Sequence, residues 1–182
     1  EAHNAEAEEL VIPAKIEGYP VTVVGEYLCQ NFSKLKKVTL PEGLKEISAF
    51  AFESCVALED IVFPSTLTTI RDSAFFSCNS LTSIALPEKT KTIEDYAFFA
   101  CDNLTELSLF QTSGLDMIFD MSIVTKVTIG EGASFIAESA FEYCEALTEV
   151  KLPSTLTSIK AYAFYGCTAL ERLTLPEGLV SI

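Results

Sequence analysis

The chain has 182 residues, of which 49% are hydrophobic and 21% charged, and this balance excludes a wholly disordered polymer. Twelve Lys and Arg residues against 26 Asp and Glu residues give a formal net charge of -14, which repels phosphate backbones, so nucleic acid is not an expected partner. Charged residues or prolines interrupt every apolar run well before it reaches the length of a membrane helix, so we expect no membrane insertion of this segment.

The first ten residues form a polar stretch, and the regular part of the sequence begins at residue 11. We therefore expect one domain over 11–182 after a polar stretch at 1–10. There is no starting Met and no basic segment followed by an apolar one, so a signal peptide, if the natural protein has one, is expected to have been removed or to lie outside this chain. The chain also stops in the middle of a repeat unit, which predicts a longer natural protein or an exposed last coil.

Two sequence frames recur along the chain and predict its fold. The first, Ala-Phe-x-x-Cys-x-x-Leu, occupies 51–58, 74–81, 97–104, 140–147 and 163–170. The second, Leu-Pro-x-x-Leu-x-x-Ile with small variations, occupies 40–47, 63–70, 86–93, 152–159 and 175–182. Successive cysteines at 55, 78 and 101 are 23 residues apart, a period typical of leucine-rich repeats. The sequence predicts an α/β leucine-rich-repeat solenoid, a right-handed superhelix of about seven coils.

Each unit divides into elements that can be placed in chain order. Short strands are predicted at 35–40, 58–63, 81–86, 104–109, 124–129, 147–152 and 170–175, because apolar and polar residues alternate there. A proline closes most of these strands, and a second extended piece, with Leu67 and Ile70 as an example, lies on the opposite wall. The Ala-Phe-x-x-Cys-x-x-Leu frame is predicted to form a short helix or 3₁₀ turn, with Asp72, Ser73, Asp95 and Ser139 as caps.

One coil, at about 110–129, departs from the pattern. Cys101 and Cys144 are 43 residues apart, three fewer than two full units. Phe110 and Gly130 replace prolines, and Met121 falls at the cysteine position. An irregular segment within a regular array is a candidate for function, although its apolar residues can equally fill the core at a shifted register; these are Met117, Ile118, Phe119 and Met121.

The two frames, together with the opening VIPAKIEGYPVTVVGEY at 11–27, closely resemble the BspA-like leucine-rich repeats of bacterial surface proteins. The resemblance covers nearly the whole chain. It implies a secreted or cell-surface protein, often engaged in adhesion to host matrix, to other cells or to mucosal material, and it implies no enzymatic activity.

The residues themselves offer no convincing catalytic, metal or cofactor site. The chain's one histidine, His3, lies in the polar stretch, so no base is available within the repeats to activate a serine or cysteine. We interpret the six cysteines as buried free thiols; a disulfide between neighbouring coils and a metal site are the less favoured alternatives. The phenylalanines at 52, 75, 98, 141 and 164 are interpreted as core.

The outward side chains of the predicted strands are the candidate partner-binding face, because solenoids of this class bind through their extended sheet. The face mixes small and charged residues and has no aromatic anchor. The candidate residues are Lys37, Thr39, Asp60, Val62, Ser83, Ala85, Glu106, Ser108, Lys126, Thr128, Glu149, Lys151, Arg172 and Thr174.

Three functions remain open at this point. The first is a monomeric binding or adhesion module for a protein or glycan partner, such as host matrix or a cell surface. The second is a structural spacer within a larger surface protein. The third, an enzyme, is disfavoured because the repeats lack catalytic groups.

Overall fold

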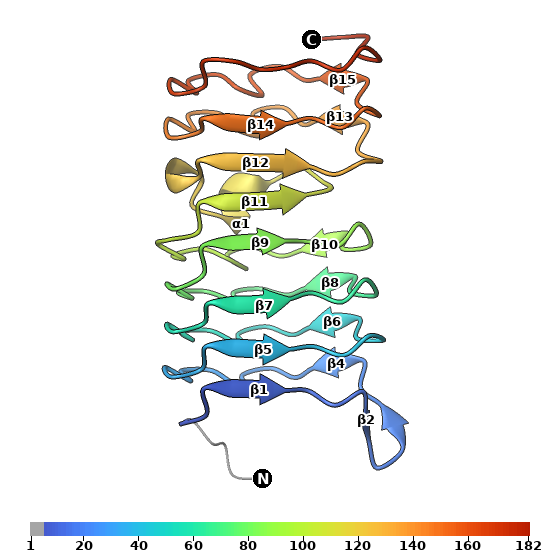
Figure 1. The fold of residues 1–182 in the computed structure, drawn as a ribbon, viewed down its shortest axis with the longest axis vertical. Coiled ribbons are helices and arrows are strands. Elements are labelled where there is room, and N and C mark those ends of the chain that lie inside the picture. Colours follow the sequence, from blue (N-terminus) through green and yellow to red (C-terminus); the bar gives the residue numbers. More distant parts are fainter. Residues whose placement is uncertain (1–5) are drawn as a thin grey trace.

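The structure is a computed structural model that describes residues 6–182. The chain winds into a right-handed coil with two strand-bearing walls, and each coil stacks on the one before it from the N-terminal end to the C-terminal end (Figure 1). The predicted solenoid fold is therefore confirmed. No helix in the described part of the chain is long and apolar enough to cross a membrane.

The front wall consists of parallel strands that follow one another at one per coil (Figure 1). Within the front strands inward and outward residues alternate; Val38, for example, is 2% exposed between the outward residues Lys37 and Thr39. The front strands are β1 (Glu9–Val11), β5 (Lys37–Thr39), β7 (Asp60–Val62), β9 (Ser83–Ala85), β11 (Glu106–Leu109), β12 (Lys126–Ile129) and β14 (Glu149–Lys151).

The first and last front segments differ from the prediction. Strand β1 begins at Glu9, inside the stretch expected to precede the repeats, and pairs with β5 in register. The predicted strand at 170–175 is not formed, although Leu170 and Leu173 still pack against the core. One coil earlier, the Thr148 and Glu149 N–H groups both donate to the Thr125 carbonyl oxygen. No corresponding bond to the Thr148 carbonyl oxygen is formed, so the last segment does not pair as a strand.

The back wall is built from two-residue strands at the predicted extended piece after each proline turn. Ile47 and Ile70 there are fully buried. These strands are β4 (Val23–Val24), β6 (Glu46–Ile47), β8 (Thr69–Ile70), β10 (Thr92–Ile93), β13 (Phe135–Ile136) and β15 (Ser158–Ile159). An antiparallel hairpin of β2 (Lys15–Ile16) and β3 (Tyr19–Pro20) projects from the first coil.

Of the two predicted forms, a short helix or a 3₁₀ turn, the Ala-Phe-x-x-Cys frame forms neither a helix nor a continuous 3₁₀ turn; it forms consecutive turns whose bonds within the coil span three residues, as in a 3₁₀ turn. Backbone N–H groups alternate between two targets: Ala51, Glu53 and Cys55 donate three residues back within their own coil. The N–H groups between them, on Phe52 and Ser54, donate to carbonyls of the next coil. A helix would direct every N–H group along its own axis, so the bonds between coils exclude it.

The alternation depends on left-handed backbone conformations that recur in each coil. Phe50 and Ser54 have φ values of 57° and 57°, and Ser73 and Ser77 repeat them one coil later at 52° and 58°. Ser73 therefore lies within a turn and does not cap a helix, and Asp72 accepts a bond from Phe50 N–H through its carbonyl oxygen. The predicted caps at Asp72, Ser73, Asp95 and Ser139 are wrong because no helix begins beside them.

The core is dominated by a column of stacked phenylalanine rings. Phe52, Phe75 and Phe98 are at most 1% exposed, with ring centroids 5.1 and 5.0 Å apart. Phe119 continues the column at 5.4 Å from Phe98, and Phe141 stacks on Phe164 higher in the solenoid. The prediction that the repeated phenylalanines form the core is confirmed.

The front sheet is interrupted once between regular coils, at a seam between β7 and β9. Strands β1, β5 and β7 form one sheet and β9, β11, β12 and β14 another. Phe63 directly follows β7, at a position where other units have Leu or Ile, and its ring lies edge-on to Phe75 and Phe98 at 5.7 and 6.2 Å. We attribute the seam to this larger side chain, which adds volume to the core between the two coils.

The short coil interrupts the back wall instead. It contains helix α1 (Leu115–Ile118) and the 3₁₀ turn η1 (Met121–Ile123) in place of a back strand. Phe119, and not Ile118, occupies the phenylalanine column, one position from the alignment that placed Met121 with the cysteines. The front strands β11 and β12 remain fully paired across this coil.

Thr112 supplies a side-chain hydrogen bond where the pairing of back-wall strands is missing. Its hydroxyl oxygen accepts a bond of 2.8 Å from the buried Ala137 N–H, and the residue is 2% exposed. Thr112→Val keeps the shape but leaves this N–H without its acceptor, so we expect the free energy of unfolding to fall by about 1–3 kcal/mol. Denaturant titration measures this loss, with Thr39→Val on the exposed face as the matched control. An unchanged midpoint for Thr112→Val would contradict the assignment.

Phe110 and Gly130, which replace the two prolines of the short coil, pack against each other. The ring of Phe110 occupies the space beside Gly130, where an added Cβ would lie 2.2 Å from a ring carbon. We expect Gly130→Ala to destabilise the fold by about 1–2 kcal/mol, because the half-buried ring can move only partly away. Combining it with Phe110→Ala should cost less than the sum of the single changes, as a double-mutant cycle in denaturant would show. Additive changes would refute the pairing.

Candidate binding surface

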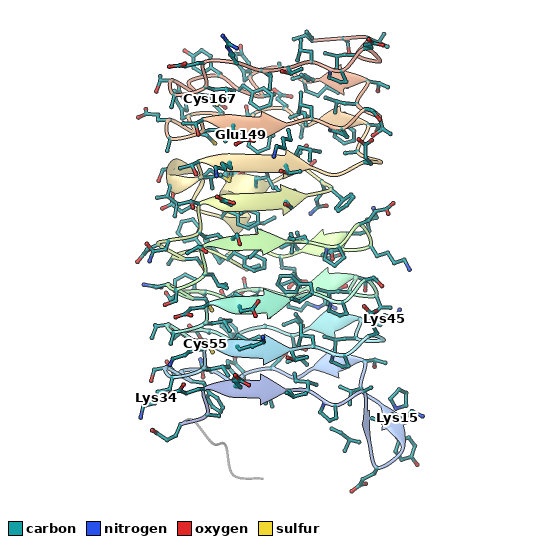
Figure 2. The ribbon with its side chains drawn as sticks, viewed as in Figure 1. Lys15, Lys34, Lys45, Cys55, Glu149 and Cys167 are labelled. Atoms are coloured by element: carbon teal, nitrogen blue, oxygen red, sulfur yellow. The ribbon has the colours of Figure 1, made fainter. Side chains whose placement is uncertain are left out.

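The front wall brings most of the predicted face residues together in two columns. One column runs through the first strand positions, where Ser83, Glu106, Lys126 and Glu149 are paired across adjacent strands. The other runs two residues further on, through Ala85, Ser108, Thr128 and Lys151. Figure 2 shows Glu149 on β14 of this face. Ser108 and Thr128 are half-buried, whereas the other predicted residues on these strands are exposed.

Three of the four cations predicted for this face, Lys37, Lys126 and Lys151, are held in ion pairs. Lys37 Nζ lies 3.2 Å from Asp60, and Lys126 Nζ lies 2.9 Å from Glu106. Lys151 pairs with Glu149 on the same strand at 3.2 Å. Each partner is about half exposed or more, so the pairs contribute little to stability and can be exchanged for contacts with a ligand.

The structure divides the predicted face into separate parts. The seam separates Lys37, Thr39, Asp60 and Val62 on one sheet from the residues of β9 to β14 on the other. A shallow depression of about 290 Å³ crosses the seam, with Asp60, Ser83 and Glu106 in its lining. Arg172 and Thr174 are exposed but lie outside both sheets. They line a wider depression of about 930 Å³ beside β14.

The sequence prediction missed two residues of the face. Glu9 and Val11 on β1 pair with Lys37 and Thr39, and Val11 is 67% exposed. They were assigned to the polar stretch or its edge because the two repeat frames begin only later. Apolar Leu10 lies between these two outward residues, and this alternation was the signal that could have identified the strand.

The short coil contributes mainly to the core. Ile118, Phe119 and Met121 are at most 9% exposed, whereas Met117 is 39% exposed. Of the two interpretations of this coil, core filling at a shifted register accounts for three of the four residues.

The cysteines form a buried column of thiols. All six are free, and Cys55, Cys78 and Cys101 each donate to a backbone carbonyl of the preceding coil over 3.1, 3.2 and 3.2 Å. Burial raises the pKa of the Cys55 and Cys101 thiols to about 12. A thiol with so high a pKa is not a nucleophile at neutral pH, so this column is structural. Figure 2 places Cys55 and Cys167 on the same side of the solenoid.

We expect six free thiols when the unreduced chain is denatured and titrated. In the folded protein Cys167 should alkylate first, because it is half-buried while the other five are buried. Peptide mass spectrometry after timed alkylation identifies the order. Fewer than six thiols, or labelling of Cys78 as fast as Cys167, would contradict the structure.

No group of three or more His, Cys, Asp or Glu side chains within residues 6–182 is arranged to hold a metal ion. His3 lies outside the described residues. Of the two adjacent carboxylates, Glu8 pairs with Lys36 and Glu9 lies on the front strand β1, so both are solvated charges.

The stacked coils, their parallel front sheet and the short back-wall strands that repeat in the regular coils define a leucine-rich-repeat solenoid. A family model described as the BspA type leucine-rich repeat region matches residues 3–115 and 115–182 in six copies. The chain therefore belongs to the BspA-type leucine-rich repeat family. The six copies compare with about seven coils expected from the sequence.

Solved structures with the same fold come from several bacteria. A leucine-rich repeat protein of T. pallidum is 28% identical, with a TM-score of 0.54 over 91% of this chain and 78% of its own. One from Eubacterium ventriosum is 20% identical, with 0.60 over 95% and 56%. The pneumococcal vaccine antigen PcpA is 20% identical, with 0.63 over 88% and 38%. A search of curated proteins found no match. The family defines a repeat module of the binding or structural kind, and these neighbours share its fold.

Proposed function

We propose that the chain is a non-catalytic binding module of a secreted or cell-surface protein, and that its front wall binds a protein or glycan partner. The observation that carries the proposal is the front face itself, where outward side chains of adjacent strands lie in register over β9 to β14. The membership in a family of surface-type repeats supports the location. The likeness to a pneumococcal vaccine antigen is consistent with it at the level of the fold.

The physical basis is a rigid array with exchangeable charges. Strand pairing fixes the spacing of the outward residues, so little conformational entropy is lost when a partner docks. The ion pairs Lys37–Asp60 and Lys126–Glu106 are exposed and can open toward charged groups of a ligand. The face lacks large aromatic side chains, so affinity is expected to come from many modest contacts.

Binding of the purified chain to immobilised host matrix proteins and to a glycan array tests the proposal. Lys37→Glu, Lys126→Glu and Arg172→Glu should weaken any interaction found by about tenfold when combined, because charge reversal on the face creates repulsion. Lys45→Glu, Lys89→Glu and Lys91→Glu combined are the matched control, since all three are exposed in the segments between the front and back strands and they reverse the same number of charges. Equal losses in both sets would place the interaction elsewhere.

The alternative function is a spacer that holds another domain away from a surface. The close backbone pairing between coils, which makes the module stiff, is the observation that favours it. A spacer predicts that the repeats alone bind nothing on either panel while the intact protein does.

A further inference from the structure

The clearest group of exposed aromatic rings lies away from the front wall, on the turns of the last two Ala-Phe-x-x-Cys segments. Tyr143, Tyr162 and Tyr165 are 58%, 60% and 55% exposed. The Tyr165 ring contacts the other two, with centroids 5.4 Å from Tyr143 and 5.9 Å from Tyr162. Both contacts are edge-to-face, at 81° and 88°. We call these three residues the tyrosine cluster.

The backbone fixes the tyrosine cluster in place. Tyr143 N–H donates to the Tyr165 carbonyl at 2.7 Å, which aligns the two turns. Tyr143 and Tyr162 occupy the left-handed positions of their turns, both with φ of 57°. Gly166 lies beside Tyr143, and a Cβ there would come within 2.6 Å of the tyrosine ring. The earlier coils have Asn31, Ser54, Ser77 or Ala100 at this position, so the glycine leaves room for the ring.

The turns that carry the tyrosine cluster are acidic, with Glu138, Glu142 and Glu145 against Lys160, and they belong to a wall that is acidic along the whole solenoid. We define the turn wall as residues 25–34, 48–57, 71–80, 94–103, 113–122, 137–146 and 160–169. It has a formal charge of -8, against -14 for the whole chain, since eleven acidic residues face three basic ones. The acidic residues are Glu26, Glu53, Asp72, Glu94, Asp95, Asp102, Asp116, Asp120, Glu138, Glu142 and Glu145.

Two of the three cations of the turn wall, Arg71 and Lys34, are paired with acidic residues, and the third, Lys160, lies two residues before Tyr162. Arg71 donates to Glu46 at 2.9 Å and to Glu94 at 2.7 Å, so it links three coils. Lys34 pairs with Glu6. By contrast the front strands carry acidic and basic residues in similar numbers, and several of them are ion-paired. Attraction for a cation is therefore concentrated on the turn wall, next to the exposed rings.

We propose that the tyrosine cluster and its acidic surroundings form a second binding surface, which takes an Arg- or Lys-rich segment of a protein partner. A cationic side chain gains from the electron-rich ring faces and from the nearby carboxylates Glu142 and Glu145 at the same time. The edge-to-face arrangement suits a guanidinium group inserted beside a ring more than a flat sugar, because the three rings do not form a coplanar platform. The surface is distinct from the front wall and does not depend on its function.

Fluorescence anisotropy with a labelled peptide of alternating Arg and Ser tests the proposal on the full chain. Tyr143→Ala with Tyr165→Ala should weaken binding about fivefold to tenfold without changing the net charge. Tyr19→Ala is the matched control, since this ring is 76% exposed on the N-terminal hairpin. A peptide with Gln in place of Arg should not bind. Circular dichroism and thermal melting establish that each variant folds.

A second pair of variants separates a local surface from a general effect of net charge. Glu142→Gln with Glu145→Gln and Glu171→Gln with Glu177→Gln each remove two negative charges, but only the first pair borders the tyrosine cluster. The first pair should weaken peptide binding several-fold more than the second at low salt. Equal effects of the two pairs would overturn the proposal, as would wild-type affinity in the folded tyrosine variant. The proposal would also be overturned if the unmodified chain had no affinity for the Arg peptide and the tyrosine variant instead lost binding to a glycan.

Discussion

Phe75→Ala is expected to lower the free energy of unfolding by about 3–5 kcal/mol, because it removes a fully buried ring from the middle of the column. Phe75 stacks on Phe52 and Phe98 and also lies edge-on to Phe63, so three rings lose a contact at once. Neighbouring coils can move inward only partly, since their backbones are joined to each other. Urea or guanidinium titration followed by circular dichroism measures the loss.

Val62→Ala is the matched control for this prediction. Val62 is 71% exposed on the front-wall strand β7, so its truncation should change the free energy of unfolding by no more than about 0.5 kcal/mol. Similar effects of the two changes would show that the ring column is not the centre of the core.

The free energy of unfolding is expected to fall steeply between pH 9 and pH 12. Burial raises the pKa of Cys29, Cys55, Cys101 and Cys144 to about 12, whereas an unfolded thiol titrates near 9. The folded chain then holds more protons than the unfolded chain, so stability is full below pH 9 and is lost as the pH rises toward 12. Each buried thiol contributes a slope of up to about 1.4 kcal/mol per pH unit.

Lysine and tyrosine titrations also act in this range, so the thiol contribution is measured by difference. Cys55→Ala removes one thiol and should make the loss of stability with pH correspondingly shallower, with little change in slope below pH 8. Denaturant titrations at pH 7, 9 and 10.5 give the comparison. A slope identical to that of the unmodified chain would show that the buried thiol titrates normally.

The columns of the fold could be predicted from the sequence because a constant interval converts directly into stacking. Phe75 and Phe98 are 23 residues apart, so they occupy equivalent places in adjacent coils wherever the coils begin. The outward pairs Ser83–Glu106 and Lys126–Glu149 follow from the same interval and from strand alternation. Partner identity does not follow, because the same outward positions accept many side chains without affecting the core.

Features that depend on contacts between coils could not be predicted. The spacing of Ala51, Phe52 and Cys55 matches one face of a helix, but the bonds that Phe52 and Ser54 donate to the next coil are not visible in a single unit. The seam follows from one larger residue, Phe63, whose consequence depends on the rings it meets. In the tyrosine cluster, Tyr143 and Tyr165 are 22 residues apart, one fewer than the length of the repeat. They therefore do not occupy equivalent positions in their coils.

The two interruptions of the walls lie at different heights and on opposite sides of the solenoid. At the seam the front ladder is absent while β8 and β10 remain paired behind it, and at the short coil the front strands β11 and β12 remain paired while the back ladder is absent. Each level therefore keeps one intact line of backbone bonds. Because the two interruptions lie on opposite walls, neither interrupted boundary loses both ladders, and the stiffness of the module continues past each of them.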